Sequence, residues 1–331
     1  MSVIPARWAA ASRWSGSFDL RCVLKALKGR GFLRATPGEL AAAGLPPRLL
    51  GQLQDGYSVA CGHQWRTLES PDYPRQLLEL EKPPPVVFLR GRAELLDREG
   101  LAVVGSRRCT PYGRQVARSL GRGCAERGAT LISGAAFGID TAAHVGALEL
   151  EGPTLAVLAQ GLDVEAGGDS GGLHRRILEG GGLLVSERLP LEPATRWAFP
   201  RRNRLIAALG RATVVVEAGK RSGALYTAEA AGLLGRDVFA VPGRIDVSAA
   251  AGTNQLLVDG AQVLANLDRV LKPFEVAASP QARLRAALPG NLPELSRRTG
   301  LAPRQVLSLL SAWELTQQVR LLPSGSYALV Q

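Results

Sequence analysis

The stretch LAVVGSRRCTPYGRQVARSLGRGCAERGATLISGAAFGID, residues 101–140, decides the fold class of this chain. It starts with an apolar run, Leu101–Val104, followed by the turn Gly105-Ser106-Arg107 and by a segment with helical spacing, Gly113–Glu126. A second apolar run, Thr130–Ile132, leads into another turn of small residues. A short apolar run, a helix and a second apolar run are typical of a β–α–β unit. The stretch therefore predicts two neighbouring parallel strands joined by a helix.

The same alternation continues on both sides of this stretch. Further strands are predicted at Val86–Leu89, Thr154–Leu158, Leu183–Val185, Thr213–Val216 and Asp237–Val241. Further helices are predicted at Asp140–Glu149, Leu173–Glu179, Arg202–Gly210 and Tyr226–Leu234. Apolar strands that alternate with helices favour an α/β fold with a mostly parallel sheet covered on both faces. Ligands of such sheets bind outside the carboxyl ends of the strands, at the point where the strand order reverses.

The two ends of the chain have different patterns. Short helices are expected at Phe18–Arg30, from Pro37 and after Pro47, and prolines around residues 70–74 and 82–85 suggest an ordered connector. The order helix, turn, helix, hairpin over residues 292–330 is that of a winged-helix domain. We therefore expect a helical domain at 1–60, the α/β core at 61–272, a linker at 273–284 and a winged-helix domain at 285–331.

Composition excludes several classes of protein. The chain has 331 residues, of which 46% are hydrophobic, so it is long and apolar enough for a folded core. Its four cysteines form no CxxC pair and its three histidines lack ligand spacing, so we expect reduced thiols and no metal site. Arginines interrupt the first residues before a signal sequence develops, and no charge-free stretch reaches membrane-spanning length. We expect a cytoplasmic protein.

Two windows of the sequence carry positive charge without any carboxylate. The first, between Glu99 and Glu126, holds five arginines, and the second, between Glu192 and Glu217, holds five more. The formal net charge is +11, but the excess is spread along the chain, so the local windows are the stronger signal. Guanidinium groups pair with phosphate oxygens and stay charged at cellular pH. Nucleic acid is therefore the partner that the windows indicate.

Three turns between a strand and a helix have the composition of anion-binding loops. They are Gly105-Ser106-Arg107, Ser133–Asp140 and Gly219–Ala224, and glycine permits close approach of a ligand to the helix N-terminus. None has the GxGxxG spacing of a dinucleotide site or the Walker A spacing, so neither NAD nor ATP hydrolysis is expected. For Gly105-Ser106-Arg107, an ordinary strand-to-helix turn with a solvated arginine remains the alternative.

The segment Phe199-Pro200-Arg201-Arg202-Asn203-Arg204 places an aromatic ring beside three arginines. Such a combination suits a single strand of nucleic acid, whose bases stack on the ring while the backbone follows the charge. A core phenylalanine beside solvated arginines fits the same residues equally well.

Two short motifs imitate a serine protease. The segments Thr141–His144 and Gly168–Gly172 are similar to those around the histidine and serine of chymotrypsin-like enzymes. In those enzymes, β-barrel strands and the catalytic aspartate lie between the two motifs, and the triad is defined by its geometry. Here too few residues separate the motifs to form such strands. We interpret His144 as a packed helix residue and Gly167–Gly172 as a glycine-rich loop.

The order of motifs along residues 70–265 is specific although each motif alone is weak. The motifs are Asp72-Tyr73-Pro74, Pro83-Pro84 with Arg90-Gly91, Val104–Arg107, Ser133–Ala135 with Gly138–Asp140 and Ala143-His144, Ser186-Glu187, Phe199-Pro200 with Arg202–Arg204, Glu217-Ala218 with Ser222–Leu225 and Thr227-Ala228, Val241–Gly243, and Gly252–Asn254 with Gly260-Ala261. In this combination the chain resembles the DNA-processing protein A family, also called DprA or Smf. It departs from the family's pattern at Glu165–Ser170, where we expect a loop of altered shape.

The resemblance implies an extended Rossmann-like core with a sterile-alpha-motif-like helical domain before it and a winged-helix domain after it. It also implies a dimeric, non-enzymatic protein that binds single-stranded DNA without sequence preference, protects incoming DNA in natural transformation and loads the RecA recombinase. By motif position Arg107, Phe199, Arg202 and Lys220 or Arg221 would line the DNA pocket. No cofactor, metal or membrane is implied.

Together the loops and the resemblance define a candidate DNA site. Its residues are Gly105, Ser106, Arg107, Ser133, Gly134, Phe199, Arg201, Arg202, Asn203, Arg204, Lys220, Arg221, Ser222 and Gly223. Two other functions stay open. One is a nucleotide phosphoribohydrolase-like enzyme, although Val241-Pro242-Gly243-Arg244 lacks its PGGxGTxxE signature. The other is a duplex-DNA regulator acting through residues 285–331.

Overall fold

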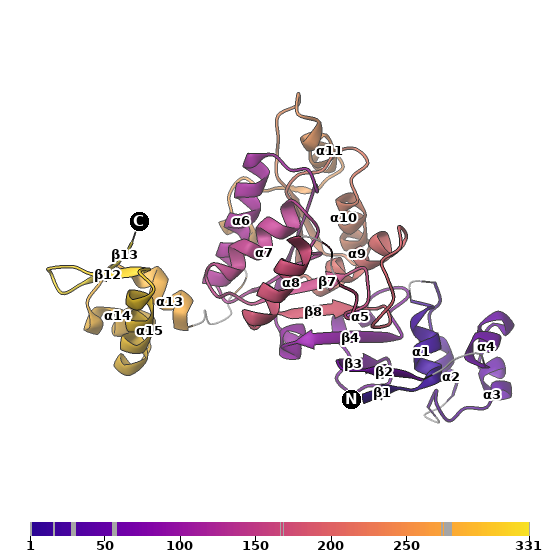
Figure 1. Ribbon diagram of the computed structural model, residues 1–331. Coiled ribbons are helices and arrows are strands. Elements are labelled where there is room, and N and C mark those ends of the chain that lie inside the picture. Colours follow the sequence, from indigo (N-terminus) through magenta and orange to yellow (C-terminus); the bar gives the residue numbers. More distant parts are fainter. Residues whose placement is uncertain are drawn as a thin grey trace.

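A computed structural model describes residues 2–15, 17–27, 31–54, 58–165, 167, 169–272, 274 and 280–330. Its centre is a nine-stranded sheet with helices on both faces (Figure 1). No helix among the described residues is both long and apolar enough to span a lipid bilayer.

The central sheet has the strand order β11-β10-β9-β5-β6-β7-β8-β4-β3. Its strands are β3 (Gln64–Thr67), β4 (Val86–Gly91), β5 (Gly100–Val104), β6 (Thr130–Ser133), β7 (Thr154–Leu158), β8 (Leu183–Ser186), β9 (Ala212–Val215), β10 (Asp237–Ala240) and β11 (Gln262–Val263). Neighbouring strands from β11 to β8 are parallel, whereas β4 is antiparallel to β8 and β3 is antiparallel to β4. The chain leaves β5 toward β6 on one side, and it returns to add β9 on the other. The strand order therefore reverses between β5 and β9.

Both faces of the parallel strands are buried. Alternate side chains of β5 point to opposite faces, so Leu101 and Val103 pack in one hydrophobic cluster and Ala102 and Val104 in another. Every residue of β5 through β9 is buried, which explains why these strands read as continuous apolar runs.

Helices of the core connect the strands and cover the sheet. They are α5 (Arg75–Leu78), η1 (Ala93–Asp97), α6 (Pro111–Glu126), α7 (Ile139–Leu148), α8 (Asp169–Glu179), α9 (Ala198–Leu209), α10 (Ala224–Leu233), η2 (Ser248–Ala250), α11 (Ala251–Val258) and α12 (Asp268–Leu271). Buried residues of α6 and α7 pack on one face of the sheet, while those of α9 and α10 pack on the other.

The N-terminal region shares a hydrophobic core with the sheet. Its elements are β1 (Ser2–Ile4), α1 (Ala6–Ser12), α2 (Arg21–Ala26), α3 (Pro37–Ala42), α4 (Pro47–Gln54) and β2 (Val59–Cys61). Trp8, Trp14 and Phe32 form an aromatic group whose cluster also includes Phe88 of β4. The antiparallel pair β1–β2 closes this region.

The C-terminal region has its own buried cluster. It contains α13 (Pro280–Ala287), α14 (Leu292–Thr299), α15 (Pro303–Leu315) and the antiparallel pair β12 (Val319–Leu321) and β13 (Tyr327–Leu329). Leu284, Leu295, Leu310 and Trp313 are buried together. Figure 1 shows this region beside α6, away from the edge of the sheet that carries β3.

The expected α/β fold is confirmed, and the structure corrects details of it. Each strand predicted between residues 86 and 241 is present, but Val86–Leu89 is antiparallel to its neighbour because two antiparallel strands extend the sheet at that edge. The pattern did not predict β1, β2, β3 or α1. The helix expected at Phe18–Arg30 is shorter, Arg21–Ala26, and residues 28–30 lie outside the described part of the chain.

Candidate functional site

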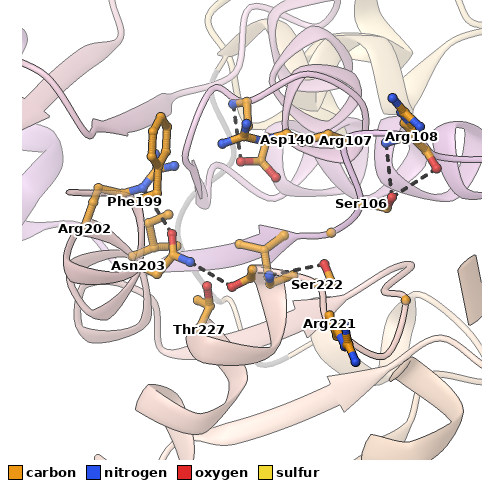
Figure 2. Close-up of a pocket in the computed structure, with 17 residues that line it drawn as sticks. Ser106, Arg107, Arg108, Asp140, Phe199, Arg202, Asn203, Arg221, Ser222 and Thr227 are labelled. Atoms are coloured by element: carbon orange, nitrogen blue, oxygen red, sulfur yellow. Dashed lines mark hydrogen bonds between the residues drawn. The ribbon is translucent and has the colours of Figure 1, made fainter. Parts of the chain in front are cut away.

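A cavity of about 530 Å³ lies outside the carboxyl ends of β5 and β9, where the strand order reverses. Its walls come from the β5–α6 loop, the β6–α7 loop, the first turns of α9 and the β9–α10 loop (Figure 2). A smaller cavity of about 190 Å³ adjoins it and shares Arg107, Ala136, Phe199 and Arg202. Crevices at such reversal points are the usual ligand sites of open parallel sheets.

The β5–α6 loop is held in place by bonds to the β9–α10 and β6–α7 loops. The Ser106 N–H donates to the Glu217 carbonyl oxygen (2.7 Å), and the Ile139 N–H donates to the Ser106 carbonyl oxygen (3.2 Å). The Ser106 hydroxyl accepts from the Arg108 N–H (3.1 Å) and closes a small turn. Gly138 has φ +85° at the contact between the loops, and a side chain there would clash with the Ser106 carbonyl oxygen. The loop is therefore rigid at the place where two arginines leave it.

Three exposed arginines surround the cavity. Arg107 and Arg108 come from the β5–α6 loop, and Arg221 comes from the β9–α10 loop (Figure 2). In the part of the chain that the structure describes, none of the three takes part in an ion pair. Their charges are therefore available to an anionic ligand.

An aromatic ring lies under one of these arginines. The Arg107 guanidinium carbon is 4.8 Å from the centroid of the Phe199 ring, within the range of a cation–π contact. Phe199 is half-buried and lines both cavities. A flat ring and a flat cation thus lie together at the junction of the two cavities.

Arg202 has a different role from the exposed arginines. It is 4% exposed, and its Nη1 donates to the carbonyl oxygens of Gly134 (2.6 Å) and Val157. Burial lowers the pKa of Arg202 to about 10, and the charge of Asp140 opposes that decrease. The guanidinium thus joins the carboxyl ends of β6 and β7 through its hydrogen bonds.

Asp140 is the buried anion of the site. Burial raises the pKa of its carboxyl, while the charge of Arg202 and the N–H groups of Ala136 and Gly134 act in the opposite direction. The carboxylate accepts from Gly134 N–H (3.2 Å) and Ala136 N–H (3.4 Å) and so shapes the β6–α7 loop.

Asn203 connects the two sides of the cavity. Its side-chain amide donates to the Gly223 carbonyl oxygen (2.9 Å) at the start of α10, while its carbonyl oxygen accepts from Arg202 Nε (3.2 Å). Asn203 therefore fixes α9 against the β9–α10 loop.

The structure brings most of the predicted site residues together. Those that line the main cavity are Gly105, Ser106, Arg107, Phe199, Arg202, Asn203, Arg221, Ser222 and Gly223. Gly134 lines the adjoining cavity. Four predicted residues line neither cavity: Ser133, Arg201, Arg204 and Lys220.

The four residues that line neither cavity differ in burial and in their contacts. Ser133 is fully buried, and its hydroxyl donates to the Val103 carbonyl oxygen (2.6 Å). Arg204 points from α9 toward the N-terminal region, where it pairs with Glu187 and donates to the Ser15 hydroxyl (3.0 Å) and the Lys82 carbonyl oxygen (2.9 Å). Arg201 and Lys220 are exposed outside the cavity walls.

Among the residues that line the main cavity, the sequence interpretation missed three with polar side chains: Arg108, Asp140 and Thr227. Arg108 stands in the first acid-free window, and the other two belong to quoted motifs, so a signal existed for each. The protease-like motifs do not form a triad. His144 is fully buried within α7, where its Nδ1 is 2.7 Å from the Thr154 hydroxyl, so its interpretation as a packed helix residue is confirmed. The predicted loop at Gly167–Gly172 is wrong in part, because α8 begins at Asp169; Gly168 lies outside the described residues.

No group of three or more His, Cys, Asp or Glu side chains that could hold a metal ion occurs among the residues described. The polar groups of the main cavity are instead three exposed arginines, the buried side chains of Arg202 and Asp140, hydroxyls and loop N–H groups. This arrangement can bind phosphate groups and stack a flat ring.

Comparison with known proteins gives the family of the chain. The model of the family described as DNA recombination-mediator protein A matches residues 64–275. A relative from Mycobacterium tuberculosis (strain ATCC 25618 / H37Rv) is 40% identical over 255 residues, covering 70% of this chain and 65% of its own length. The chain therefore spans slightly less than two thirds of that relative.

Two solved structures are also similar. The X-ray structure of DNA processing protein A from Streptococcus pneumoniae has a TM-score of 0.70 and 31% identity, and the match covers 82% of this chain and 99% of that one. DNA processing protein A from Helicobacter pylori, whose structure describes a single-stranded DNA binding mode, has a TM-score of 0.57 and 30% identity, with 64% of this chain and 96% of that one covered.

Proposed function

The chain belongs to the DNA recombination-mediator protein A family, and from that premise we propose that it binds single-stranded DNA without sequence preference through the cavity between β5 and β9. The observation that carries this proposal is the set of three exposed arginines around the Phe199 ring. Similarity to the Helicobacter pylori protein supports the choice of a single strand as ligand.

The division of roles follows from burial. Arg107, Arg108 and Arg221 are exposed and contact phosphates, which gives binding without sequence preference. Phe199 offers a face on which an unstacked base lies, and every base has such a face. Arg202 and Asn203 hold the walls of the cavity rather than the strand, because their hydrogen bonds go to the protein.

The wider role that we propose follows from family membership. The protein protects incoming single strands in natural transformation and loads the RecA recombinase onto them, as a cytoplasmic, non-enzymatic homodimer. In this proposal the N-terminal helices form a sterile-alpha-motif-like domain and the C-terminal helices and hairpin form a winged-helix domain, flanking an extended Rossmann-like core.

The test is a binding titration of a labelled single strand at several salt concentrations. Arg107→Ala should weaken binding to strands of every sequence and reduce the slope of log K against log salt by about 0.7, the value of one phosphate contact. Arg304→Ala is the matched control, because Arg304 is an exposed arginine of α15 outside the cavity. An unchanged slope in a folded Arg107→Ala variant would contradict the proposal.

The same preparation separates the proposal from a phosphoribohydrolase. A binding protein retains single strands in preference to duplex and to mononucleotides, and it releases no free base from nucleoside monophosphates. Continued release of free base from nucleoside monophosphates over time would favour the phosphoribohydrolase.

A further inference from the structure

Apart from the main and adjoining cavities of the DNA site, the protein has a cavity of about 610 Å³ at the carboxyl ends of β9 and β10, which we name the second cavity. Its walls include parts of three sequence motifs, none of whose residues lines the cavities of the DNA site: Glu217-Ala218, Val241–Gly243 and Gly252–Asn254. The start of α6, with Thr110 and Tyr112, closes its remaining side. Its volume is in the range of small-ligand sites, about 300–1,000 Å³.

Hydrogen bonds between these motifs fix the shape of the cavity. The Asn254 side-chain oxygen accepts from the Gly243 N–H (3.1 Å), and its amide donates to the Gly243 carbonyl oxygen (3.0 Å). The Gly252 N–H donates to the Ala218 carbonyl oxygen (2.6 Å). The rim between β10 and α11 is therefore tied to the loop after β9 before any ligand arrives.

Apolar surface and a few polar groups line this cavity: the buried carboxylate of Glu217, the hydroxyl-bearing Thr110, Tyr112 and Thr253, and Arg244, which pairs with Asp246. Val216, Val241 and Ala250 supply apolar surface, and Glu217, which is 5% exposed, supplies the carboxylate. One Glu217 oxygen accepts from the Thr110 N–H (2.8 Å) and the other from the Thr110 hydroxyl (2.5 Å). A carboxylate oxygen accepts about two hydrogen bonds, so each oxygen has capacity for another donor. The cavity therefore suits a flat apolar group that carries N–H donors.

Only a thin wall separates this cavity from the DNA site. The wall is the backbone pair in which the Ser106 N–H donates to the Glu217 carbonyl oxygen. Ser106 lines the main cavity, while Glu217 lines the second cavity. Arg107 and Arg108 follow Ser106 and directly precede the segment that holds Thr110 and Tyr112, which line the second cavity; Tyr112 is 55% exposed. The second cavity therefore lies close along the chain to two arginines of the proposed DNA site.

We propose that the second cavity receives one unstacked base of the bound strand, preferentially a base with an exocyclic amino group. This inference rests on the proposed function. The amino group donates to the Glu217 carboxylate, as carboxylates do toward cytosine N4. The Tyr112 ring stacks on the neighbouring base, the usual role of exposed aromatic side chains toward single strands.

The test uses the full chain and a single strand that contains 2-aminopurine, a fluorescent base with an exocyclic amino group. In the complex with the wild-type protein, the base should be shielded from the quencher acrylamide. Val247→Trp fills the cavity, because Val247 lines it. This variant should restore quenching to the level of the free strand and weaken binding about tenfold, the effect of losing one buried base.

Two further variants control the experiment. Ile245→Trp adds the same ring two residues away, at a side chain that is 99% exposed and outside the cavity, and should change neither quenching nor affinity. Tyr112→Ala changes another lining residue, at an exposed position, and should also weaken binding, so the inference stays testable if Val247→Trp does not fold. In a second strand, cytosine takes the position of the shielded 2-aminopurine. Replacing this cytosine by uracil should weaken binding about threefold to tenfold, since the amino donor is lost.

The outcomes separate this inference from the proposed function. If Arg107→Ala weakens strand binding while the base stays open to acrylamide in the wild-type complex, the inference is wrong and the proposed function stands. Equal shielding of free 2-aminopurine deoxynucleotide would assign the cavity to free nucleotides and overturn the strand assignment. Strand binding that is indifferent to both Val247→Trp and Tyr112→Ala would leave the cavity to a protein side chain instead. If the wild-type protein binds no single strand, both ideas fail.

Discussion

Replacing Arg202 by methionine tests whether this arginine supports the site or contacts the ligand. In the folded protein its guanidinium donates to the carbonyl oxygens of Gly134 and Val157, and its charge lies near buried Asp140. Methionine keeps most of the volume of the side chain but removes the donors and the cation. The two carbonyl oxygens and the carboxylate would then lose this buried partner, and water would replace it only by entering the core.

The expected loss of stability is large. Leaving a buried acceptor without its donor costs about 1–3 kcal/mol, and two carbonyl oxygens lose the donors of Arg202, so we expect a loss of about 2–6 kcal/mol. For a unit of 150–250 residues, 1 kcal/mol shifts the melting temperature by about 2–4 °C, so Arg202→Met should melt roughly 4–24 °C below the wild type. Combining it with Asp140→Asn should cost less than the sum of the single variants, by about 0.5–3 kcal/mol.

The assay is thermal and urea unfolding followed by circular dichroism, with strand binding measured below the transition. Arg201→Met is the matched control, because Arg201 is the exposed neighbour on the same helix and should change the free energy of unfolding by only about 0.5 kcal/mol. If Arg202→Met melts with the wild type and loses strand binding, Arg202 is a ligand contact, and the assignment of a supporting role is wrong.

Two other predictions follow from single side chains. Phe199→Ala should weaken strand binding by about 1–3 kcal/mol with little change in melting temperature. Trp197→Ala, at a residue that is 75% exposed and outside the cavity, should weaken binding less. A large drop in the melting temperature of Phe199→Ala with unchanged binding would make Phe199 a core residue. Burial, with the charges of His174 and Arg202, lowers the pKa of His144 from about 6.5 to about 3, so between these pH values the unfolded chain binds a proton that the folded chain does not. The free energy of unfolding should therefore fall by up to about 1.4 kcal/mol per pH unit below pH 6.5 on account of His144. His144→Leu should lose this part of the pH dependence when urea unfolding is measured at pH 4–7. Equal pH dependence in the wild type and the variant would contradict the prediction.

The sequence was sufficient to predict the parallel core. Strands such as Leu101–Val104 are buried on both faces, so they appear as continuous apolar runs, and the helices between them are long enough to show their own period. The turns after β5 and β9 were recognisable because glycine and serine there satisfy local backbone requirements. These turns adjoin the point of strand reversal, so the site's location was also predictable.

Other features depended on pairing between distant segments. β1 pairs with β2 and β3 pairs with β4, but each of β1, β2 and β3 is only three or four residues long, so none shows a periodic pattern of its own. The antiparallel orientation of β4 likewise depends on its partner β8 rather than on its own residues.

The sequence by itself determined that positive charge gathers in two windows, since charge is a property of composition that no fold alters. Which of those arginines is available to a ligand was decided only by tertiary structure. Successive residues of a helix point about 100° apart, so Arg201 of α9 faces solvent, Arg202 faces the ends of β6 and β7, and Arg204 faces Glu187. The direction of each side chain therefore depends on how α9 packs against the sheet and the N-terminal region, and that packing is set by residues far away in the chain.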